Sequence, residues 1–294
     1  MTHVEAEIAD QPQCWARAAA LAAAGHPALP GAGERVAVVG CGTSYFMGQA
    51  YAALRESGGQ GVTDAFAASE FPTGRSYDRV IALTRSGTTT EVLELLDGLR
   101  GKVRTSAITA DPNTPVMSAA DDVVVLDFAD ERSVVQTRFA TTALTFLRAH
   151  LGLHTEAVEE DARRALAEPL PAGLVECGQF TFLGRGWTVG LANEAALKMR
   201  EAALAWTESY PAMEYRHGPI SIAAPSTATW MLGDAPVGLA EQVDSTGAHW
   251  IEGRLDPLAE LVRVHRLAVA VAAARGLDPD QPRNLTRSVI LADA

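Results

Sequence analysis

Short apolar runs and amphipathic segments alternate along most of the chain. Residues 36–39 and 80–83 are apolar runs that end at Gly40 and Thr84. Short runs of this kind are typical of parallel strands that are buried on both faces. Segments with the period of an amphipathic helix lie between such runs, at about 44–57, 89–100 and 135–151. This alternation predicts an α/β fold of the doubly wound type, with parallel sheets flanked by helices.

The second half of the chain repeats features of the first at a constant offset. The matching segments are 36–39 with 180–183, 40–42 with 184–186, and 69–71 with 213–215. Each half thus reads as a strand, a Gly-x-Gly turn, a helix and a Glu–aromatic pair. An ungapped match of this kind indicates a duplication, and a chance match of two short apolar strands is the alternative. We therefore expect two pseudo-symmetric domains.

Composition changes suggest where these domains begin and end. A polar helix followed by Pro169 and Pro171 is typical of a linker. We expect an N-terminal helical segment at 1–34, a first domain at 35–152, a linker at 153–179, and a second domain with a C-terminal tail at 180–294.

The segment 84–90 is rich in hydroxyl side chains and lies between a predicted strand and a predicted helix. It reads Thr-Arg-Ser-Gly-Thr-Thr-Thr. At the start of a helix, free N–H groups and the positive end of the helix dipole favour an anion. Gly87 allows close approach of the backbone, and Ser86 and Thr89 can donate hydrogen bonds. A cluster of helix caps is the alternative, but capping needs only one hydroxyl. The pattern predicts a phosphate-binding loop.

A second turn of the same type is Gly-Cys-Gly-Thr-Ser at 40–44, which places Thr43 and Ser44 at a helix start. It lacks the third glycine of the dinucleotide fingerprint and the Gly-Lys-Ser/Thr of a P-loop. In the second half, the equivalent of the hydroxyl-rich loop is 233–237, which has no hydroxyl and contains Asp234. We therefore expect one half to bind phosphate and the other to supply reactive groups.

The charge and the cysteines exclude several classes of partner. The net charge is -12, and without a run of basic residues such a surface disfavours nucleic acid. The apolar run 267–274 is too short to span a membrane. Three cysteines at scattered positions fit a reducing cytoplasm and match no metal site. His150 and His154, four residues apart, are interpreted as a helix-end feature, so neither a metal nor another cofactor is predicted.

Several motifs together resemble the tandem sugar isomerase (SIS) family. They lie at 41–44, 69–71, 84–89, 194–198, 201, 214–219 and 280–285. The similarity is to the isomerase half of glutamine–fructose-6-phosphate aminotransferase and to standalone phosphosugar isomerases and glucosamine-6-phosphate deaminases. Each motif alone is unspecific, whereas the combination is specific.

The resemblance implies roles for particular residues. Glu201 would move a proton between C1 and C2 of a sugar, and His217 would assist ring opening from a neighbouring subunit, which implies a homodimer. Gln136 would lie near the sugar hydroxyls. The implied phosphate-binding residues are Thr43, Ser44, Thr84, Arg85, Ser86 and Thr89.

Two departures from the family pattern limit the expected reaction. The glutamine-hydrolysing domain is absent and Met1 is followed by Thr2, so we expect no ammonia from glutamine. Arg287 stands where the synthases carry a lysine that can form an imine with a ketose. A guanidinium stays protonated and cannot act as an amine nucleophile, although Arg287 could hold a substrate oxygen.

The expected chemistry requires one well-placed carboxylate. Aldose–ketose isomerisation needs a base next to a carbonyl, and no metal or cofactor. Glu194, Lys198 and Glu201 share one face of a predicted helix. A solvated Glu–Lys pair is the alternative. The resemblance favours Glu201 as the base and leaves Lys198 either to tune it or to pair with Glu194.

The predicted function is that of a phosphosugar aldose–ketose isomerase or an amino-sugar-phosphate deaminase acting on an (amino)hexose 6-phosphate. The sequence does not separate these two reactions, which share an enediol or enolamine intermediate. A noncatalytic sugar-phosphate regulator and a fructosamine-6-phosphate-type deglycase are the alternatives. The missing glycine fingerprint argues against an NAD enzyme.

Overall fold

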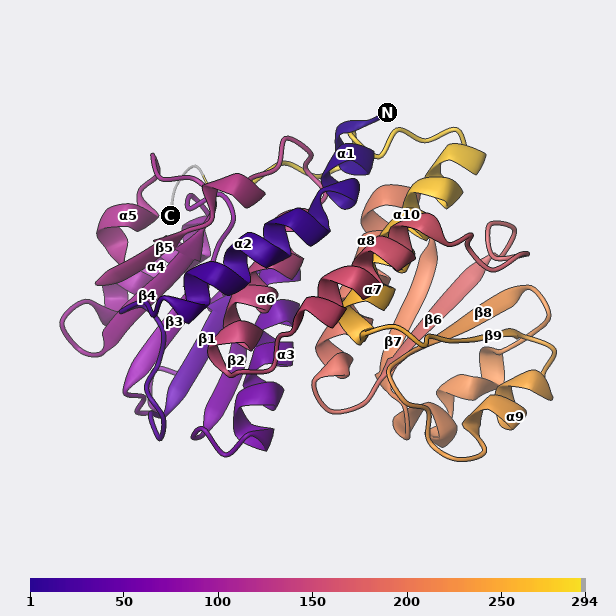
Figure 1. Ribbon diagram of the computed structural model, residues 1–294, viewed down its shortest axis with the longest axis horizontal. Helices are drawn as coiled ribbons and strands as arrows, with labels where there is room; N and C mark the ends of the chain where they lie inside the picture. Colours follow the sequence, from indigo (N-terminus) through magenta and orange to yellow (C-terminus); the bar gives the residue numbers. More distant parts are fainter. Residues whose placement is uncertain (292–294) are drawn as a thin grey trace. The chain divides into compact units, whose positions relative to one another are not determined.

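The computed structural model describes residues 1–291, which form two compact units. We call residues 13–132, 138–155 and the tail from 286 the N-terminal unit, and residues 1–12, 133–137 and 156–285 the C-terminal unit. Each unit contains one parallel sheet, and the strands can be followed in Figure 1. The chain therefore passes between the units several times.

The N-terminal unit is built on a five-stranded parallel sheet in the order β2-β1-β3-β4-β5. Its strands are β1 (Val36–Gly40), β2 (Thr63–Ala67), β3 (Arg79–Leu83), β4 (Arg104–Thr109) and β5 (Asp122–Val125). Every residue of β1 and β3 is buried, as expected for central strands covered on both faces.

Helices and short 3₁₀ turns precede, connect and follow these strands. They are α2 (Gln11–Ala23), α3 (Thr43–Ser57), η1 (Ala68–Glu70), α4 (Thr90–Leu99), α5 (Val116–Ala119), η2 (Asp127–Ala129) and α6 (Arg138–His150). α3 packs on α6. On α2, the fully buried Trp15 donates from its indole nitrogen to Thr141 Oγ1 on α6 at 3.0 Å. This bond satisfies a polar atom that would be costly to bury alone.

The C-terminal unit has a four-stranded parallel sheet in the order β7-β6-β8-β9. Its strands are β6 (Gln179–Gly184), β7 (Trp206–Pro211), β8 (Thr227–Leu232) and β9 (His249–Glu252). Its helices are α1 (His3–Ala9), α7 (Glu156–Ala167), α8 (Thr188–Ala203), η3 (Glu214–His217), η4 (Pro219–Ile222), α9 (Leu239–Asp244) and α10 (Pro257–Ala274). α10 packs on α8, on α7 and on α1.

The strand–turn–helix at the start of each sheet recurs in the structure. Gly42 and Gly186 both adopt a left-handed conformation, with φ of 54° and 58°. A Cβ on Gly40 would lie 2.7 Å from the Cβ of Ser44, and one on Gly184 would overlap the backbone of Thr188. Both turns therefore require glycine. The sheets share the order second, first, third, fourth strand. A pseudo-symmetric duplication of whole domains stays a prediction.

The α/β class and the parallel sheets expected from the sequence are confirmed. The pattern gave no signal for β2 and β7, which are edge strands with mostly half-buried residues, or for β8 and β9. The segment 153–179, expected as a linker, contains α7, whose buried face packs on α10. The tail from 286 groups with the N-terminal unit rather than with 180–285, and residues 292–294 of the expected second domain lie outside the described residues.

Candidate functional site

The hydroxyl-rich loop joins the carboxyl end of β3 to the start of α4. Thr84, Arg85 and Ser86 are buried there. The loop backbone is held by β4 and the segment after it: Thr84 donates from its N–H to Ile108 O at 3.0 Å, and Ala110 N–H donates to Arg85 O at 3.1 Å. The loop is therefore a rigid platform at the edge of the sheet where ligands of doubly wound folds bind.

Gly87 allows the sharp turn in this loop. Its φ of 63° is strained for other residues, and a Cβ at this position would overlap the side chain of Thr114. The carbonyl of Gly87 also accepts from Val116 N–H at 3.2 Å. The turn therefore requires glycine at this position. The lack of a side chain would also allow an anion to approach the backbone closely.

Two hydroxyls of the loop make no hydrogen bond to any described residue. Thr84 Oγ1 is buried without a partner. Thr89 is the N-cap residue of α4, yet its side chain makes no capping bond. Ser86 Oγ accepts only a long bond from Thr88 N–H at 3.3 Å. Buried polar atoms without partners are uncommon, so the hydroxyl of Thr84 fits a loop that is completed by a ligand. The half-buried hydroxyl of Thr89 is open to the same ligand, because it does not act as a cap.

The unpaired hydroxyl of Thr84 allows a direct test of the predicted phosphate-binding loop. We expect Thr84→Val to leave the ligand-free protein as stable as before or more stable by up to about 1 kcal/mol, because no hydrogen bond is lost. The same change should weaken a phosphorylated ligand by about 1.5–3 kcal/mol, the range for a hydrogen bond to a charged group. Thermal unfolding and calorimetric titration measure the two effects.

Thr141→Val is the matched control, because Thr141 is equally buried and its hydroxyl accepts from Trp15. This change leaves the indole N–H of Trp15 without an acceptor, so the free energy of unfolding should fall by about 1–3 kcal/mol while ligand affinity stays unchanged. A Thr84→Val protein that binds the phosphorylated ligand as tightly as the wild type would remove Thr84 from the binding loop.

The side chain of Arg85 contacts the buried acid Glu131 and the C-terminal tail. Its guanidinium is 3.7 Å from the carboxylate of Glu131 and donates to Arg287 O at 2.9 Å. Glu131 also accepts from the backbone N–H of Arg138 at 2.7 Å. The sequence placed Arg85 around the phosphate, and the structure shows that its charge is balanced by Glu131, so its part in binding stays a prediction.

The C-terminal tail runs along the start of α4. Thr88 Oγ1 donates to Ser288 Oγ at 2.9 Å, and the N–H of Thr90 donates to Val289 O at 3.2 Å. The side chain of Arg287 reaches Asp130 at 2.5 Å and the carbonyl of Glu131. In this arrangement Arg287 holds the tail on the N-terminal unit, and a contact between its guanidinium and a substrate oxygen stays a prediction.

The second turn, at the start of α3, buries Thr43 and Ser44 as expected. Cys41, just before them, is half-buried. Burial, and secondarily the negative charge of Glu91, raise the pKa of the Cys41 thiol to about 11. The thiol therefore stays protonated at neutral pH, which agrees with its interpretation as a small residue filling the turn.

In the C-terminal unit, the acidic and basic residues on one face of α8 form a buried row. Glu194 and Lys198 are 0% and 1% exposed, and the ammonium of Lys198 lies 3.7 Å from Glu194. Lys198 also forms a direct ion pair with Glu201, whose side chain is 18% exposed. The alternative of a solvated Glu–Lys pair is therefore wrong for this helix. Glu201 is the member of the row that reaches solvent.

His265 of α10 packs beside this row, and the sequence pattern did not single it out. Complete burial, and secondarily the charge of Lys198, lower the pKa of His265 to about 3. The ring is therefore neutral, and its Nδ1 lies 3.4 Å from the side-chain nitrogen of Gln11. A neutral ring adds no second positive charge next to Lys198.

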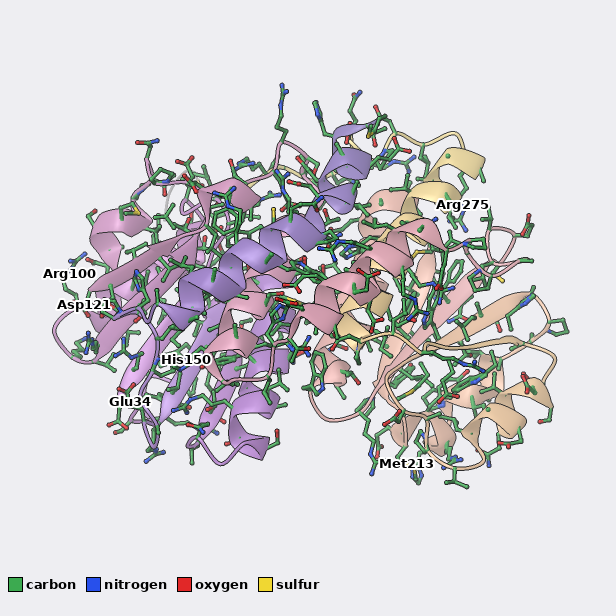
Figure 2. All side chains as sticks on the ribbon, in the orientation of Figure 1. Glu34, Arg100, Asp121, His150, Met213 and Arg275 are labelled. Atoms are coloured by element: carbon green, nitrogen blue, oxygen red, sulfur yellow. The ribbon has the colours of Figure 1, made fainter. Side chains whose placement is uncertain are left out.

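Two further predicted residues are in the C-terminal unit. The side-chain oxygen of Gln136, in the segment 133–137, is buried and has no hydrogen-bond partner among the described residues. His217 ends the short turn η3 and is exposed. Met213, which precedes this turn and is labelled in Figure 2, is 49% exposed. This exposed imidazole is accessible to a second molecule. The contact with a neighbouring subunit that the resemblance implies stays a prediction.

Within residues 1–291, no group of three or more His, Cys, Asp or Glu side chains is arranged to hold a metal ion. His150 is instead a structural residue: its Nε2 lies 3.0 Å from the carbonyl of Pro30, and burial lowers the pKa of its ring.

Among residues 1–291, none of the helices has the length and apolar character needed to cross a bilayer.

Comparison with known proteins shows a family match for part of the chain and more distant relatives for most of it. Residues 31–151 match the SIS domain family. A glutamine–fructose-6-phosphate aminotransferase [isomerizing] from Methanothermobacter thermautotrophicus is 29% identical over 303 residues, 87% of this chain and 51% of that protein. The chain thus spans about half the length of the curated relatives it matches.

Solved structures with a similar fold cover nearly all of the chain. A glucosamine-6-phosphate deaminase from Thermotoga maritima is 25% identical, covers 99% of this chain and 100% of its own, and has a TM-score of 0.83. The C-terminal domain of glucosamine-fructose-6-phosphate aminotransferase from Francisella tularensis is 20% identical, covers 96% and 98%, and has a TM-score of 0.78. The chain therefore contains a SIS domain at residues 31–151. A second SIS domain, expected at 180–294, stays a prediction.

Proposed function

We propose that this protein is an enzyme acting on a phosphorylated hexose or aminohexose, either as an aldose–ketose isomerase or as an amino-sugar-phosphate deaminase. The SIS domain and the likeness to an isomerizing aminotransferase and a glucosamine-6-phosphate deaminase support this class of function. The exact sugar and the choice between the two reactions belong to the proposal.

The observation that carries the proposal is the buried charged row on α8. The buried ammonium of Lys198 forms an ion pair with the carboxylate of Glu201, while part of the Glu201 side chain reaches solvent. Glu201 takes the proton from the carbon next to the sugar carbonyl, which leaves an enediol or enolamine. It then returns the proton to the adjacent carbon, while a proton of the C2 hydroxyl or amino group passes to O1, so no net proton is consumed. The enediol gives the ketose directly, whereas the enolamine gives a ketimine that water hydrolyses to the ketose and ammonia. Such a transfer needs one carboxylate and no redox partner.

The hydroxyl-rich loop supplies the anchor for the phosphate. The N–H of Thr90 is bonded to the tail. The other backbone N–H groups at the start of α4 and the hydroxyls of Thr84, Ser86 and Thr89 give donors to a dianion. Thr43 and Ser44 add donors from the start of α3. The net charge of -12 makes such local donors necessary for binding an anion.

The remaining assignments follow the family resemblance. Gln136 contacts sugar hydroxyls, and the orphaned oxygen of its side chain supports a polar ligand there. His217 opens the sugar ring from the neighbouring subunit of a homodimer, for which its exposure is suitable. A cytoplasmic location agrees with three free cysteines.

Incubation with glucosamine 6-phosphate, followed by assays of ammonia and fructose 6-phosphate, tests the proposed function. Ammonia together with the ketose product would select deamination. Turnover of glucose 6-phosphate or another hexose phosphate without ammonia would select isomerisation. Tight binding of all these compounds without turnover would favour a regulator, and release of an amino acid from a fructosamine 6-phosphate adduct would favour a deglycase.

A further inference from the structure

A crevice opens in the C-terminal unit at the carboxyl edge of its sheet. It has a volume of about 340 Å³ and lies where β6, β8 and β9 end. β6 is paired with β7 on one side and with β8 on the other, so the strand order reverses between β6 and β8. Such a reversal at the carboxyl edge is where open α/β sheets bind ligands.

Two arginines line this crevice. Arg185 directly follows β6, and Arg254 lies two residues after β9. Both are exposed, and neither guanidinium makes a hydrogen bond or an ion pair within residues 1–291. The two exposed arginines of α7, Arg163 and Arg164, are by contrast both paired with nearby acids. Two unpaired guanidinium groups at one crevice supply the positive charge and the paired N–H donors that bind a phosphate group.

One acid lines the crevice beside them. Asp234 follows β8 and is exposed, and it is the one carboxylate among the described lining residues. A carboxylate repels a bare phosphate but accepts hydrogen bonds from hydroxyl groups. Glu252, at the end of β9, is turned to the backbone N–H of Ala235 at 3.1 Å. The lining therefore combines two cations with one hydroxyl acceptor.

The walls of the crevice are held in place by short-range bonds. Thr188 Oγ1 accepts from Arg185 N–H at 2.8 Å and donates to Arg185 O at 3.1 Å, which fixes the backbone of that arginine. Gly233 has a φ of 89°, and a Cβ there would lie 3.6 Å from Thr188 and 3.7 Å from Pro257. A Cβ at this lining position would thus make ordinary contacts with both residues, while the positive φ favours glycine there.

We propose that this crevice is a second ligand site, which binds the phosphate ester of a sugar or another polyol. Arg185 and Arg254 hold the phosphate, and Asp234 accepts from a hydroxyl of the same ligand. The segment 233–237 has no hydroxyl side chain, which is why the sequence predicts no phosphate there. The cations come instead from two neighbouring turns. This site is independent of the hydroxyl-rich loop and of the reaction assigned to Glu201.

Equilibrium binding with sorbitol 6-phosphate tests the proposal, because this polyol ester has no carbonyl and cannot be isomerised. Measurements use the full chain and a Ser86→Ala/Thr89→Ala variant, in which the hydroxyl-rich loop is weakened. We expect one bound equivalent that persists in this variant. Adding Arg185→Ala and Arg254→Ala should weaken that equivalent at least tenfold, and Asp234→Asn should weaken it less.

Arg100→Ala/Arg163→Ala is the control, because it removes the same charge from two exposed arginines elsewhere. Equal binding in the control and in the Arg185→Ala/Arg254→Ala variant would overturn the proposal. Inorganic phosphate is the second probe, and we expect it to bind more weakly than sorbitol 6-phosphate. Equal affinity for the two would overturn the assignment of a polyol ester. Loss of binding through Ser86→Ala/Thr89→Ala alone would show a single site in the hydroxyl-rich loop.

Discussion

Glu201→Gln is expected to reduce turnover of the phosphorylated sugar by about 100- to 10,000-fold while leaving its KM nearly unchanged. An amide has almost the same shape as the carboxylate but cannot accept the proton, and general acid–base catalysis contributes a factor of this size. Because the change removes an interaction of the transition state and not of the bound sugar, the loss should appear in kcat. Steady-state kinetics with the preferred substrate measures it.

Glu241→Gln serves as the control, because Glu241 lies exposed on α9 in the same unit. It should keep the wild-type rate. Thermal unfolding of both variants separates lost chemistry from lost structure, since Glu201 also pairs with Lys198. A folded Glu201→Gln protein with the wild-type kcat would exclude Glu201 as the base.

Lys198→Met is expected to lower the free energy of unfolding by about 3–5 kcal/mol. The ammonium of Lys198 is the positive charge between Glu194 and Glu201, and Glu194 is 0% exposed. Removing one partner of a buried ion pair leaves the other charge uncompensated in a poorly solvated place. Denaturant unfolding at neutral pH measures the loss.

A second substitution shows whether the uncompensated acid causes this loss. Adding Glu194→Gln to Lys198→Met removes the buried negative charge, so a large part of the stability should return. Lys102→Met, at an exposed lysine, should change the free energy of unfolding by less than about 0.5 kcal/mol. If Lys198→Met were as stable as Lys102→Met, the buried row would not depend on this charge.

The sequence predicted β1 and β3 as short apolar runs, but it missed β8, in which every residue is also buried. β1 and β3 are completely buried, so their apolar runs are visible without any knowledge of neighbours. β2 contains Asp64 and β7 contains Glu208, and each lies at one edge of its sheet. An edge strand has a solvated side, so its pattern is weaker and depends on pairing that the local sequence does not show.

Short sequence motifs likewise predicted those parts of the candidate site that are formed by residues close together in the chain. The hydroxyl-rich loop and the row on α8 are each formed within a few residues, and both are where the spacing placed them. Three features depend on residues far apart in the chain and were missed: the pairing of Arg85 with Glu131, the tail along α4, and His265 beside Lys198. Tertiary packing alone creates these contacts, so no periodicity or spacing can predict them.

Exchange of solvent deuterium into the sugar tests the central claim most directly, because a proton moved by Glu201 can be replaced by a deuteron from solvent before it is returned. The protein is incubated in deuterium oxide with glucosamine 6-phosphate, glucose 6-phosphate and fructose 6-phosphate, and the carbons next to the carbonyl are followed by NMR. We predict incorporation at C1 or C2 of at least one of these sugars with the wild-type protein, and none above background with Glu201→Gln. Saturable binding of these sugars without any exchange, or equal exchange in both proteins, would contradict proton transfer by Glu201.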